Sequence, residues 1–502
     1  MKKIIIIGGG VAGLGAAYKV RRAAAAGHDV DCVLVERNDR LGGKLATDIV
    51  TDPDGGEYIV DGGSDAFVST KPAVARIARM LGMGDAMVPA REENKKTLIV
   101  RGGSLVELPD GIMMFAPTKL VPLATTRLYS WPAKFRMALD LVLPRTVRWA
   151  EGETAQDHDE TLEHFVVRRM GRESLDRLAE PLVGGVHASD PREMSLAATF
   201  PNFLEMEQEF GSLIRGFLAE RKKREAMRKK HPPKPGAKPW AFFNTFYRGM
   251  QQLTDGMAEA VGRERIIVGA SVTAIARDGD AWRVTLDDGR TLAGDAVIVA
   301  TEAWAAEPLA RQVDGAIADL LAAIPCSSSA TVPMAFRSAD FPADTKWFGI
   351  LSPIVENRPL LAVTLSSSKW PDRAPDGRVL LRGFIGGPRN QHLLEASDEE
   401  IIETIRAQIV DLLGMGPDVQ PVFASVYRWA GGMPQYTLGH LDRVDEIERL
   451  SAGVRAFALA GGAYRGVGIP NCIESGERAV TKVLGDLGVT YEEDTAPRRP
   501  GQ

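Results

Sequence analysis

Residues 2–36 read KKIIIIGGGVAGLGAAYKVRRAAAAGHDVDCVLVE, and this stretch decides the fold class of the 502-residue chain. The apolar run at 2–7 predicts a buried strand, and the alanine-rich segment 11–26 predicts a helix despite its glycines. Residues 30–36 are again apolar and predict a second strand. A strand, a helix and a strand in immediate succession indicate a βαβ unit, and therefore a parallel sheet.

Three glycines between the first strand and the helix follow the pattern Gly-x-Gly-x-x-Gly. Gly8 permits a tight turn, Gly10 lets a pyrophosphate approach the backbone, and Gly13 lets the helix pack closely on the strand. The free N–H groups at the helix N-terminus would then hold the pyrophosphate. Glu36 ends the second strand about 20 residues further on, where a carboxylate accepts hydrogen bonds from a ribose hydroxyl. The residues expected to form this dinucleotide site are Gly8, Gly9, Gly10, Val11, Ala12, Gly13, Glu36 and Arg37.

Further glycine turns favour FAD over NAD as the dinucleotide. The turns at 40–44 and 61–64 could each be ordinary, but in this order they suit a long, extended cofactor. Near the other end of the chain, the glycine-rich stretch 461–468 precedes Pro470, which suits the first turn of a helix. The N-terminus of that helix would stabilise negative charge on a reduced flavin ring.

Composition excludes several classes of protein. The chain is 45% hydrophobic and 25% charged with a formal net charge of −5, which is typical of a globular protein and gives no electrostatic indication of a nucleic-acid partner. The cysteines Cys32, Cys326 and Cys472 are far apart and the seven histidines form no ligand cluster, so neither disulfides nor a metal site is expected. The N-terminal apolar run is too short for a signal peptide, and no run of about 18 apolar residues is present to span a membrane. We therefore expect a cytoplasmic protein.

The rest of the chain predicts a large mixed architecture. Short strands are expected within 265–300 and at 330–336, 378–386 and 456–462, and helices at 397–414 and 470–484. The expected class is α/β (α+β overall), with a Rossmann-like FAD-binding domain, a mixed-sheet substrate domain and a helical, membrane-facing lobe. The expected boundaries are 1–75, 241–310 and 426–490 for the FAD-binding domain, 76–108 and 311–425 for the substrate-binding domain, 109–215 for the lobe, 216–240 for a basic exposed insertion and 491–502 for a frayed tail.

Residues 112–148 differ in character from the rest of the chain, because they are apolar, rich in proline and methionine, and contain a single acid, Asp140. Two interpretations remain open. The segment could lie on a membrane surface, with Tyr129 and Trp131 at the interface and six cations facing anionic headgroups. It could equally be a helical lobe packed inside the protein. The six cations are Lys119, Arg127, Lys134, Arg136, Arg145 and Arg148.

Eight sequence blocks resemble the flavin-dependent protoporphyrinogen oxidase family, within the wider amine-oxidase-like flavoproteins. The blocks at 180–195, 427–440 and 460–476 separate the chain from monoamine oxidases and phytoene desaturases. The blocks are RLGGK (40–44), GGSDAF (62–67), LPDG (108–111), EPLVGGVHASDPREMS (180–195), FPNFLEMEQEFGSLIRG (200–216), SSSKWPDRAPDG (366–377), YRWAGGMPQYTLGH (427–440) and AGGAYRGVGIPNCIESG (460–476).

The resemblance implies roles for single residues. The 8–13 loop and Glu36 would hold the ADP half of FAD, and the backbone of Val272 would contact adenine. Gly43 and Lys44 would line the stretch from diphosphate to ribityl chain. The isoalloxazine would be approached by the backbone of Gly62, Gly63, Ser64 and Asp65 and covered by Trp429, Val467, Gly468 and Ile469. Arg101 would face a propionate of the substrate.

The chain departs from the family pattern in places. Relatives read Gly-Pro-(Asp/Glu)-Ser-Phe where this chain has residues 63–67, which affects the expected side-chain roles of Ser64 and Asp65. Cys326 replaces an aromatic residue that relatives often carry after Ile-Pro. His187 is interpreted as an ordinary loop histidine, so no catalytic residue is named.

The expected function is the FAD-dependent, oxygen-dependent oxidation of protoporphyrinogen IX to protoporphyrin IX, with FAD bound non-covalently. Six electrons leave in three flavin cycles, and hydrogen peroxide is released. The first alternative is oxidation of coproporphyrinogen III to coproporphyrin III; more remote ones are another amine-oxidase-like flavoenzyme and a non-enzymatic carrier. Expected partners are the porphyrinogen, molecular oxygen, a membrane surface on its cytoplasmic face, and ferrochelatase or another pathway enzyme.

Overall fold

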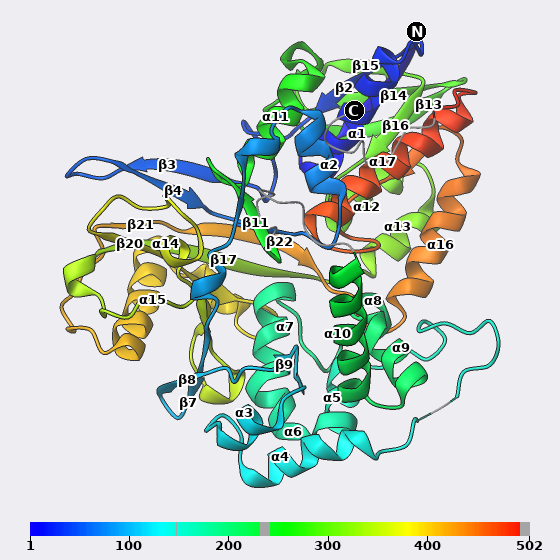
Figure 1. Ribbon diagram of the computed structural model, residues 1–502. Helices are drawn as coiled ribbons and strands as arrows, with labels where there is room; N and C mark the ends of the chain where they lie inside the picture. The colour runs from blue at the N-terminus through cyan, green and yellow to red at the C-terminus, as the bar shows by residue number, and fades with distance from the viewer. Residues whose placement is uncertain (147, 231–240, 492–502) are drawn as a thin grey trace.

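The strand that opens the chain lies in the middle of a five-stranded parallel sheet (Figure 1). The computed structural model describes residues 1–146, 148–230 and 241–491. In spatial order the strands of this sheet are β12 (Ile266–Ile267), β2 (Val30–Val35), β1 (Lys2–Ile7), β16 (Ala296–Val299) and β23 (Phe457–Leu459). The predicted parallel sheet is thus confirmed, and it joins strands from the first, middle and last parts of the sequence.

Both faces of this sheet are covered, which explains the uninterrupted run of isoleucines. Ile4 and Ile6 face a core beneath helices, whereas Ile5 and Ile7 face a second core on the other side. The first face is covered by α1 (Val11–Ala25), α2 (Ala73–Met80), α11 (Gln251–Val261) and α17 (Ile469–Asp486). The second is covered by β13 (Val272–Asp278), β14 (Ala281–Leu286), β15 (Thr291–Gly294), α12 (Ala303–Ala310), α13 (Gly315–Ala322) and α16 (His440–Gly453).

A second sheet is mixed, and most of its strands lie in the ranges expected for a substrate-binding domain. Its order is β21 (Phe423–Ala424), β17 (Cys326–Arg337), β20 (Arg378–Gly386), β19 (Leu360–Thr364), β18 (Gly349–Leu351), β7 (Thr97–Arg101) and β8 (Ser104–Glu107), with β22 (Tyr427–Pro434) also paired to β17. The β7–β18 pair is parallel and the other pairs are antiparallel. Helix α15 (Asp398–Leu413) packs on this sheet, and a reciprocal capping box between Ser397 and Glu400 fixes its start.

Short strands and one short helix connect these two parts. They are the hairpin β3 (Thr47–Thr51)–β4 (Glu57–Asp61), the three-stranded sheet β5 (Phe67–Val68)–β11 (Phe243–Phe246)–β6 (Met87–Pro89), and α14 (Ser366–Lys369).

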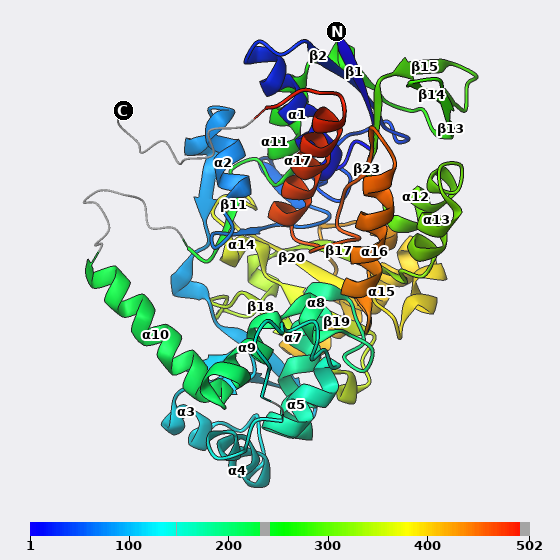
Figure 2. The same ribbon diagram turned by 90° about the vertical axis from the view of Figure 1, so that its right-hand side faces the viewer.

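A helical lobe lies at the end of the molecule opposite the parallel sheet (Figure 1). It begins with the hairpin β9 (Ile112–Met113)–β10 (Ala116–Pro117). Its helices are α3 (Leu120–Thr125), α4 (Trp131–Ala138), α5 (Leu162–Met170), α6 (Arg172–Ser174), α7 (Glu180–His187), α8 (Leu196–Thr199), α9 (Pro201–Phe210) and α10 (Leu213–Lys230). Helix α10 projects from the lobe and carries the start of the predicted basic insertion (Figure 2). The rest of that insertion, 231–240, and the predicted tail from 492 onward lie outside the described residues.

The 112–148 segment shows features of both interpretations. Trp131 and Phe135 are 61% and 69% exposed, but Tyr129, expected at an interface, is buried in the lobe core, where burial raises the pKa of its hydroxyl. Four of the six cations bind other described residues, because Lys119 pairs with Asp110 and Arg145 donates to the Glu209 carbonyl, and Lys134 and Arg136 are also bound. Lys134 donates to the carbonyls of Ala124 and Thr126, both at 2.7 Å, and Arg136 donates to carbonyls at the end of α5. Within the described stretches, every helix is too short or too polar to cross a bilayer.

Candidate functional site

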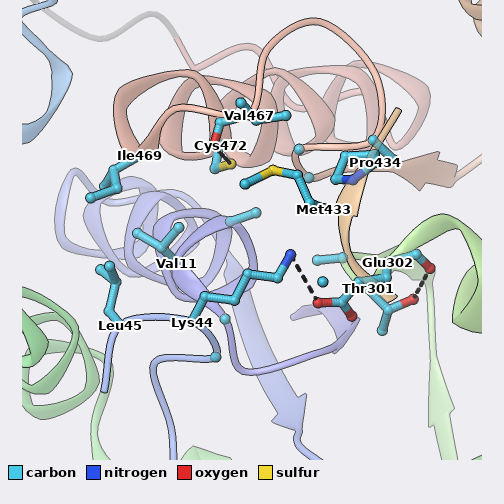
Figure 3. A pocket seen from close by; sticks show the side chains of 18 of the residues that line it. Val11, Lys44, Leu45, Thr301, Glu302, Met433, Pro434, Val467, Ile469 and Cys472 are labelled. Carbon is cyan, nitrogen blue, oxygen red and sulfur yellow. Dashed lines mark hydrogen bonds and ion pairs between the residues drawn. The ribbon is translucent and has the colours of Figure 1, made fainter. Parts of the chain in front are cut away.

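A cavity opens where three parallel strands end at the same edge of the sheet (Figure 3). The loops after β1, β16 and β23 all reach it, as expected for a doubly wound sheet, which binds ligands at the carboxyl ends of its strands. Of the residues predicted to bind a cofactor, those that line it are Gly10, Val11, Ala12, Gly43, Lys44, Ser64, Val467 and Ile469. The structure therefore brings predicted segments from both ends of the chain to one place.

Glycine is needed at the three fingerprint positions for different structural reasons. A Cβ on Gly8, whose φ is +109°, would lie 2.6 Å from the carbonyl oxygen of Ala300, and one on Gly13 would lie 1.9 Å from that of Gly8. A Cβ on Gly10 would meet no atom of the described residues within 4 Å. Packing of the protein thus requires two of these glycines, whereas Gly10 keeps open space in front of a helix N-terminus. That space is what a diphosphate needs, so the residues present fit a dinucleotide.

Two helix N-termini point their free N–H groups toward the cavity. Helix α1 begins at Val11 after the extended residue Gly10, and α17 begins at Ile469 after Gly468, which is also extended. Ala12 and Ile469, from the first turns of the two helices, line the cavity. The first N–H groups of a helix lack intrahelical acceptors and carry partial positive charge, so both ends suit an anionic or electron-rich ligand.

Glu36 holds the glycine loop from the side of the neighbouring strand. Its carboxylate accepts a 2.6 Å hydrogen bond from the N–H of Gly9 and bonds of 2.8 and 2.6 Å from the N–H and amide of Asn38. The backbone carbonyl of Glu36 accepts from the N–H of Ala270, so the chain leading to Val272 runs beside it. Arg37 lies outside the cavity lining, with its guanidinium 5.8 Å from the Trp304 ring.

A cation and a carboxylate meet inside the cavity. Lys44 Nζ lies 3.3 Å from Glu302 Oε1, and both side chains are partly exposed (Figure 3). Lys44 comes from the second glycine turn, and Glu302 is the residue just before α12. Lys44 therefore provides a positive charge close to the α1 N-terminus.

The 62–65 segment borders the cavity through Ser64, and its other members face the protein. A Cβ on Gly62 would lie 2.3 Å from the Tyr427 ring, and one on Gly63 would lie 1.9 Å from the Lys44 carbonyl oxygen. The Asp65 carboxylate points toward the mixed sheet, 2.9 Å from Arg382. Trp429 donates from its indole N–H to the Gly62 carbonyl at 3.1 Å, which places it behind this segment.

Two thiols line the cavity. Burial raises the pKa of Cys472 to about 11 and raises that of Cys326 as well. Both thiols are therefore protonated near neutral pH, and a protonated thiol is a poor nucleophile.

Arg101 lies apart from this cavity. It lines a different one with Thr126 and Arg127, donates to the Arg127 carbonyl, and has its guanidinium 3.9 Å from Glu173. The side chain of His187 lies outside what the structure describes.

Several lining residues were missed by the sequence analysis. The apolar strand DAVIVAT was a signal that could have found some of them, because the residues that follow a parallel strand lie at the ligand-binding edge of the sheet. The missed residues are 300–303 and 432–434, with Leu45, Cys326 and Cys472.

Comparisons with known proteins agree with this geometry. Residues 11–484 match the family model described as flavin containing amine oxidoreductase. Coproporphyrinogen III oxidase of Bacillus subtilis (strain 168) is 31% identical over 489 residues, covering 96% of this chain and 98% of that protein. Chloroplastic protoporphyrinogen oxidase of Nicotiana tabacum is 26% identical over 500 residues, covering 96% and 85%.

A solved structure shows the same fold. It is a protein from Exiguobacterium sp. 255-15, provisionally named a protoporphyrinogen oxidase, with a TM-score of 0.81 and 27% identity over 97% of this chain and 99% of that one. Sequence, fold and cavity therefore agree on the class of protein. The chain belongs to the flavin-containing amine oxidoreductases and, within them, to the FAD-dependent porphyrinogen oxidases.

Proposed function

We propose that this protein oxidises coproporphyrinogen III to coproporphyrin III, with oxygen as the electron acceptor. The observation that carries the proposal is the greater identity to the B. subtilis coproporphyrinogen III oxidase than to the tobacco protoporphyrinogen oxidase. The choice reverses the substrate expected from the sequence, protoporphyrinogen IX. Six electrons and six protons leave the substrate, so three molecules of oxygen become three of hydrogen peroxide.

The chain's contribution is to bind and orient the cofactor. FAD, when bound, supplies a two-electron acceptor that oxygen reoxidises. The α1 N-terminus and Lys44 would hold the diphosphate, in the space that Gly10 leaves free. Glu36 would accept hydrogen bonds from the ribose, and the backbone at Val272 would contact adenine.

The flavin end would lie between the 62–65 segment and the start of α17. Ser64, Val467 and Ile469 would contact the ring, and the α17 N-terminus would stabilise negative charge there. Because Cys326 and Cys472 are protonated, we propose that the cofactor stays non-covalent. FAD released into solution by denaturation is the expected result, and flavin retained by the precipitated chain would contradict it.

Arg101 stays our proposed contact for a substrate propionate, although it lies outside the cofactor cavity. The Arg101→Ala variant should raise KM more than it lowers kcat, because the guanidinium would act in binding alone. An unchanged KM would remove Arg101 from the substrate site.

The decisive experiment supplies purified holoprotein with each porphyrinogen under air and follows porphyrin fluorescence. Faster turnover of coproporphyrinogen III supports the proposal, and faster turnover of protoporphyrinogen IX restores the original expectation. Peroxide measured alongside should reach three equivalents per porphyrin if oxygen is the acceptor.

We also propose that the exposed apolar patch of the lobe rests on a membrane surface. Its large hydrophobic side chains lie on α3, α4 and the turn after α4. From there the product would pass to the next pathway enzyme, for which we propose ferrochelatase. The patch residues are Leu120, Val121, Trp131, Phe135, Leu139 and Val142.

Vesicle binding tests the membrane proposal. Trp131→Ser combined with Phe135→Ser should abolish cosedimentation with anionic lipid vesicles. Val268→Ser, at an exposed position beside β12, is the matched control and should not change it. Equal cosedimentation of both variants would remove the patch from membrane binding.

A further inference from the structure

Arg382 holds the chain segment that borders the flavin end of the cavity. It lies on β20 and is buried, and its guanidinium donates to the carbonyls of Asp61 at 2.9 Å and Gly63 at 2.7 Å. The same guanidinium lies 2.9 Å from the carboxylate of Asp65. One side chain thus spans three alternate residues of the segment.

Neighbouring side chains complete this fixation. The carbonyl of Gly62, between the two that Arg382 binds, accepts from Trp429 and from the Thr331 hydroxyl. Three successive carbonyls are therefore held by residues outside the cavity lining, while Ser64 borders the cavity. The orientation of the backbone at 61–63 is set from the mixed sheet.

The anchoring carboxylate is charged and shared. Asp65 also accepts from Lys369 at 3.1 Å and from the Trp370 indole at 3.0 Å. Burial alone would raise the pKa of Asp65, but the charges of Arg382 and Lys369 outweigh it and hold the pKa well below its usual range. The carboxylate therefore stays ionised and paired throughout the pH range in which the protein would work.

Buried ion pairs of this kind are a poor source of stability. Desolvation of the ions offsets much of their attraction, and well-packed apolar residues often serve stability equally well. What the charges provide is a fixed geometry. A guanidinium offers several donors in a rigid plane, which lysine does not.

We propose that Arg382 is a positioning residue, which fixes the backbone of residues 62–65 against the flavin ring and thereby sets the ring's environment. The inference rests on the cofactor placement proposed above. Arg382 itself is separated from the cavity by the segment it binds. Loss of the Arg382 side chain should therefore change both the properties of the bound flavin and the affinity of the protein for FAD.

The test compares holoprotein variants on one strand. Arg382→Met should weaken FAD binding about tenfold or more and shift the visible spectrum and reduction potential of the bound flavin, because charged hydrogen bonds to the segment are lost. Arg382→Lys should restore only part of the change. Arg378→Met, which breaks pairs with Asp52 and Asp54 on the β3–β4 hairpin, is the control and should lower Tm with an unchanged spectrum.

Two further variants make every outcome informative. If Arg382→Met fails to fold, Thr331→Val removes one bond to the Gly62 carbonyl and should shift the spectrum in the same direction. Wild-type spectrum, potential and FAD affinity in the Arg382 variant, or in Thr331→Val where it alone folds, would overturn the inference. Unchanged FAD affinity in Gly10→Val would instead overturn the cofactor placement.

Discussion

A Cβ added to Gly476 would lie 2.1 Å from the carbonyl oxygen of Ala12, so α17 and α1 touch through their backbones. A second contact lies one turn along the same pair of helices, where a Cβ on Gly15 would be at van der Waals distance, 3.5 Å, from the Cα of Ile473. The two contacts bring the N-termini of both helices to the same cavity. A site made from the two ends of the chain therefore depends on Gly476, which lies outside the cavity lining.

Gly476→Ala should destabilise the protein by about 1–3 kcal/mol, because the atom it meets is backbone and the helices must separate. Thermal unfolding of the FAD-free protein measures the effect. Gly485→Ala, on the same helix, is the matched control, since its Cβ would meet nothing within 4 Å among the described residues. It should stabilise the protein by up to about 1 kcal/mol through helix propensity. Equal Tm values for the two variants would contradict the close contact.

Gly10→Val should abolish FAD binding and leave the fold intact, because its side chain would fill the space in front of α1. Absorbance of the purified protein in the visible range reports the flavin, and circular dichroism reports the fold. Gly315→Ala serves as a control, because its Cβ also meets nothing within 4 Å in the described part of the chain and Gly315 lies away from the cavity. A yellow, fully loaded Gly10→Val protein would exclude a diphosphate at this position.

The sequence predicted the elements well where local pattern and burial agree. The isoleucine run, the fingerprint and the helix ending at Gly414 each carry a local signal, such as a buried strand, a tight turn or a positive φ of 63°. Within the strands expected at 265–300, the local signal is Asp287-Asp288-Gly289, the turn that joins β14 to β15 as an antiparallel hairpin. These features depend on residues close together in the sequence.

What could not be predicted depends on partners far away in the sequence. The direction of the Asp65 side chain is set by Lys369 and Arg382, about 300 residues later, and nothing near Asp65 signals it. The burial of Tyr129 likewise depends on how the lobe helices pack, whereas its neighbour Trp131 begins an exposed helix face. Patterns of composition describe such a segment only on average.

Asp140→Asn should destabilise the lobe by about 3 kcal/mol or more, because a buried guanidinium loses the nearer of its two carboxylate partners, the other being Glu207 at 3.5 Å. Asp140 and Arg169 are 0% and 1% exposed, with the Arg169 Nε 2.7 Å from Asp140 Oδ1. Urea unfolding measures the change, with the exposed Glu151→Gln as control. A midpoint equal to that of the control would show that this buried pair is dispensable.

Lys44→Met should weaken FAD binding, whereas Glu302→Gln should not. If Lys44 binds the diphosphate, its loss removes a charged contact and should weaken binding about tenfold. Glu302→Gln removes an anion that competes for Lys44 at 3.3 Å, so binding should stay equal or tighten. Titration of the FAD-free proteins gives both constants. Tighter binding by Lys44→Met would exclude Lys44 as a contact of the diphosphate.

The pH dependence of stability should report Glu180, a carboxyl on α7 that is 9% exposed. Burial raises its pKa from 4.5 to about 7, although its carboxylate accepts a hydrogen bond from the N–H of Ile354. The folded state therefore binds the proton more tightly than the unfolded state, so the stability that this group contributes is fully present below pH 4.5. That stability is lost as the pH rises to about 7.

Glu180→Gln removes this titration and keeps the side-chain shape. The unfolding free energy of the wild type minus that of the variant should fall by about 3 kcal/mol between pH 4.5 and 7.5, because the rising pH destabilises the wild type relative to the variant. Denaturant unfolding across this range measures the difference. A constant difference would mean that Glu180 titrates as it does in the unfolded chain, and a rising one would mean that the carboxylate is the form that the fold prefers.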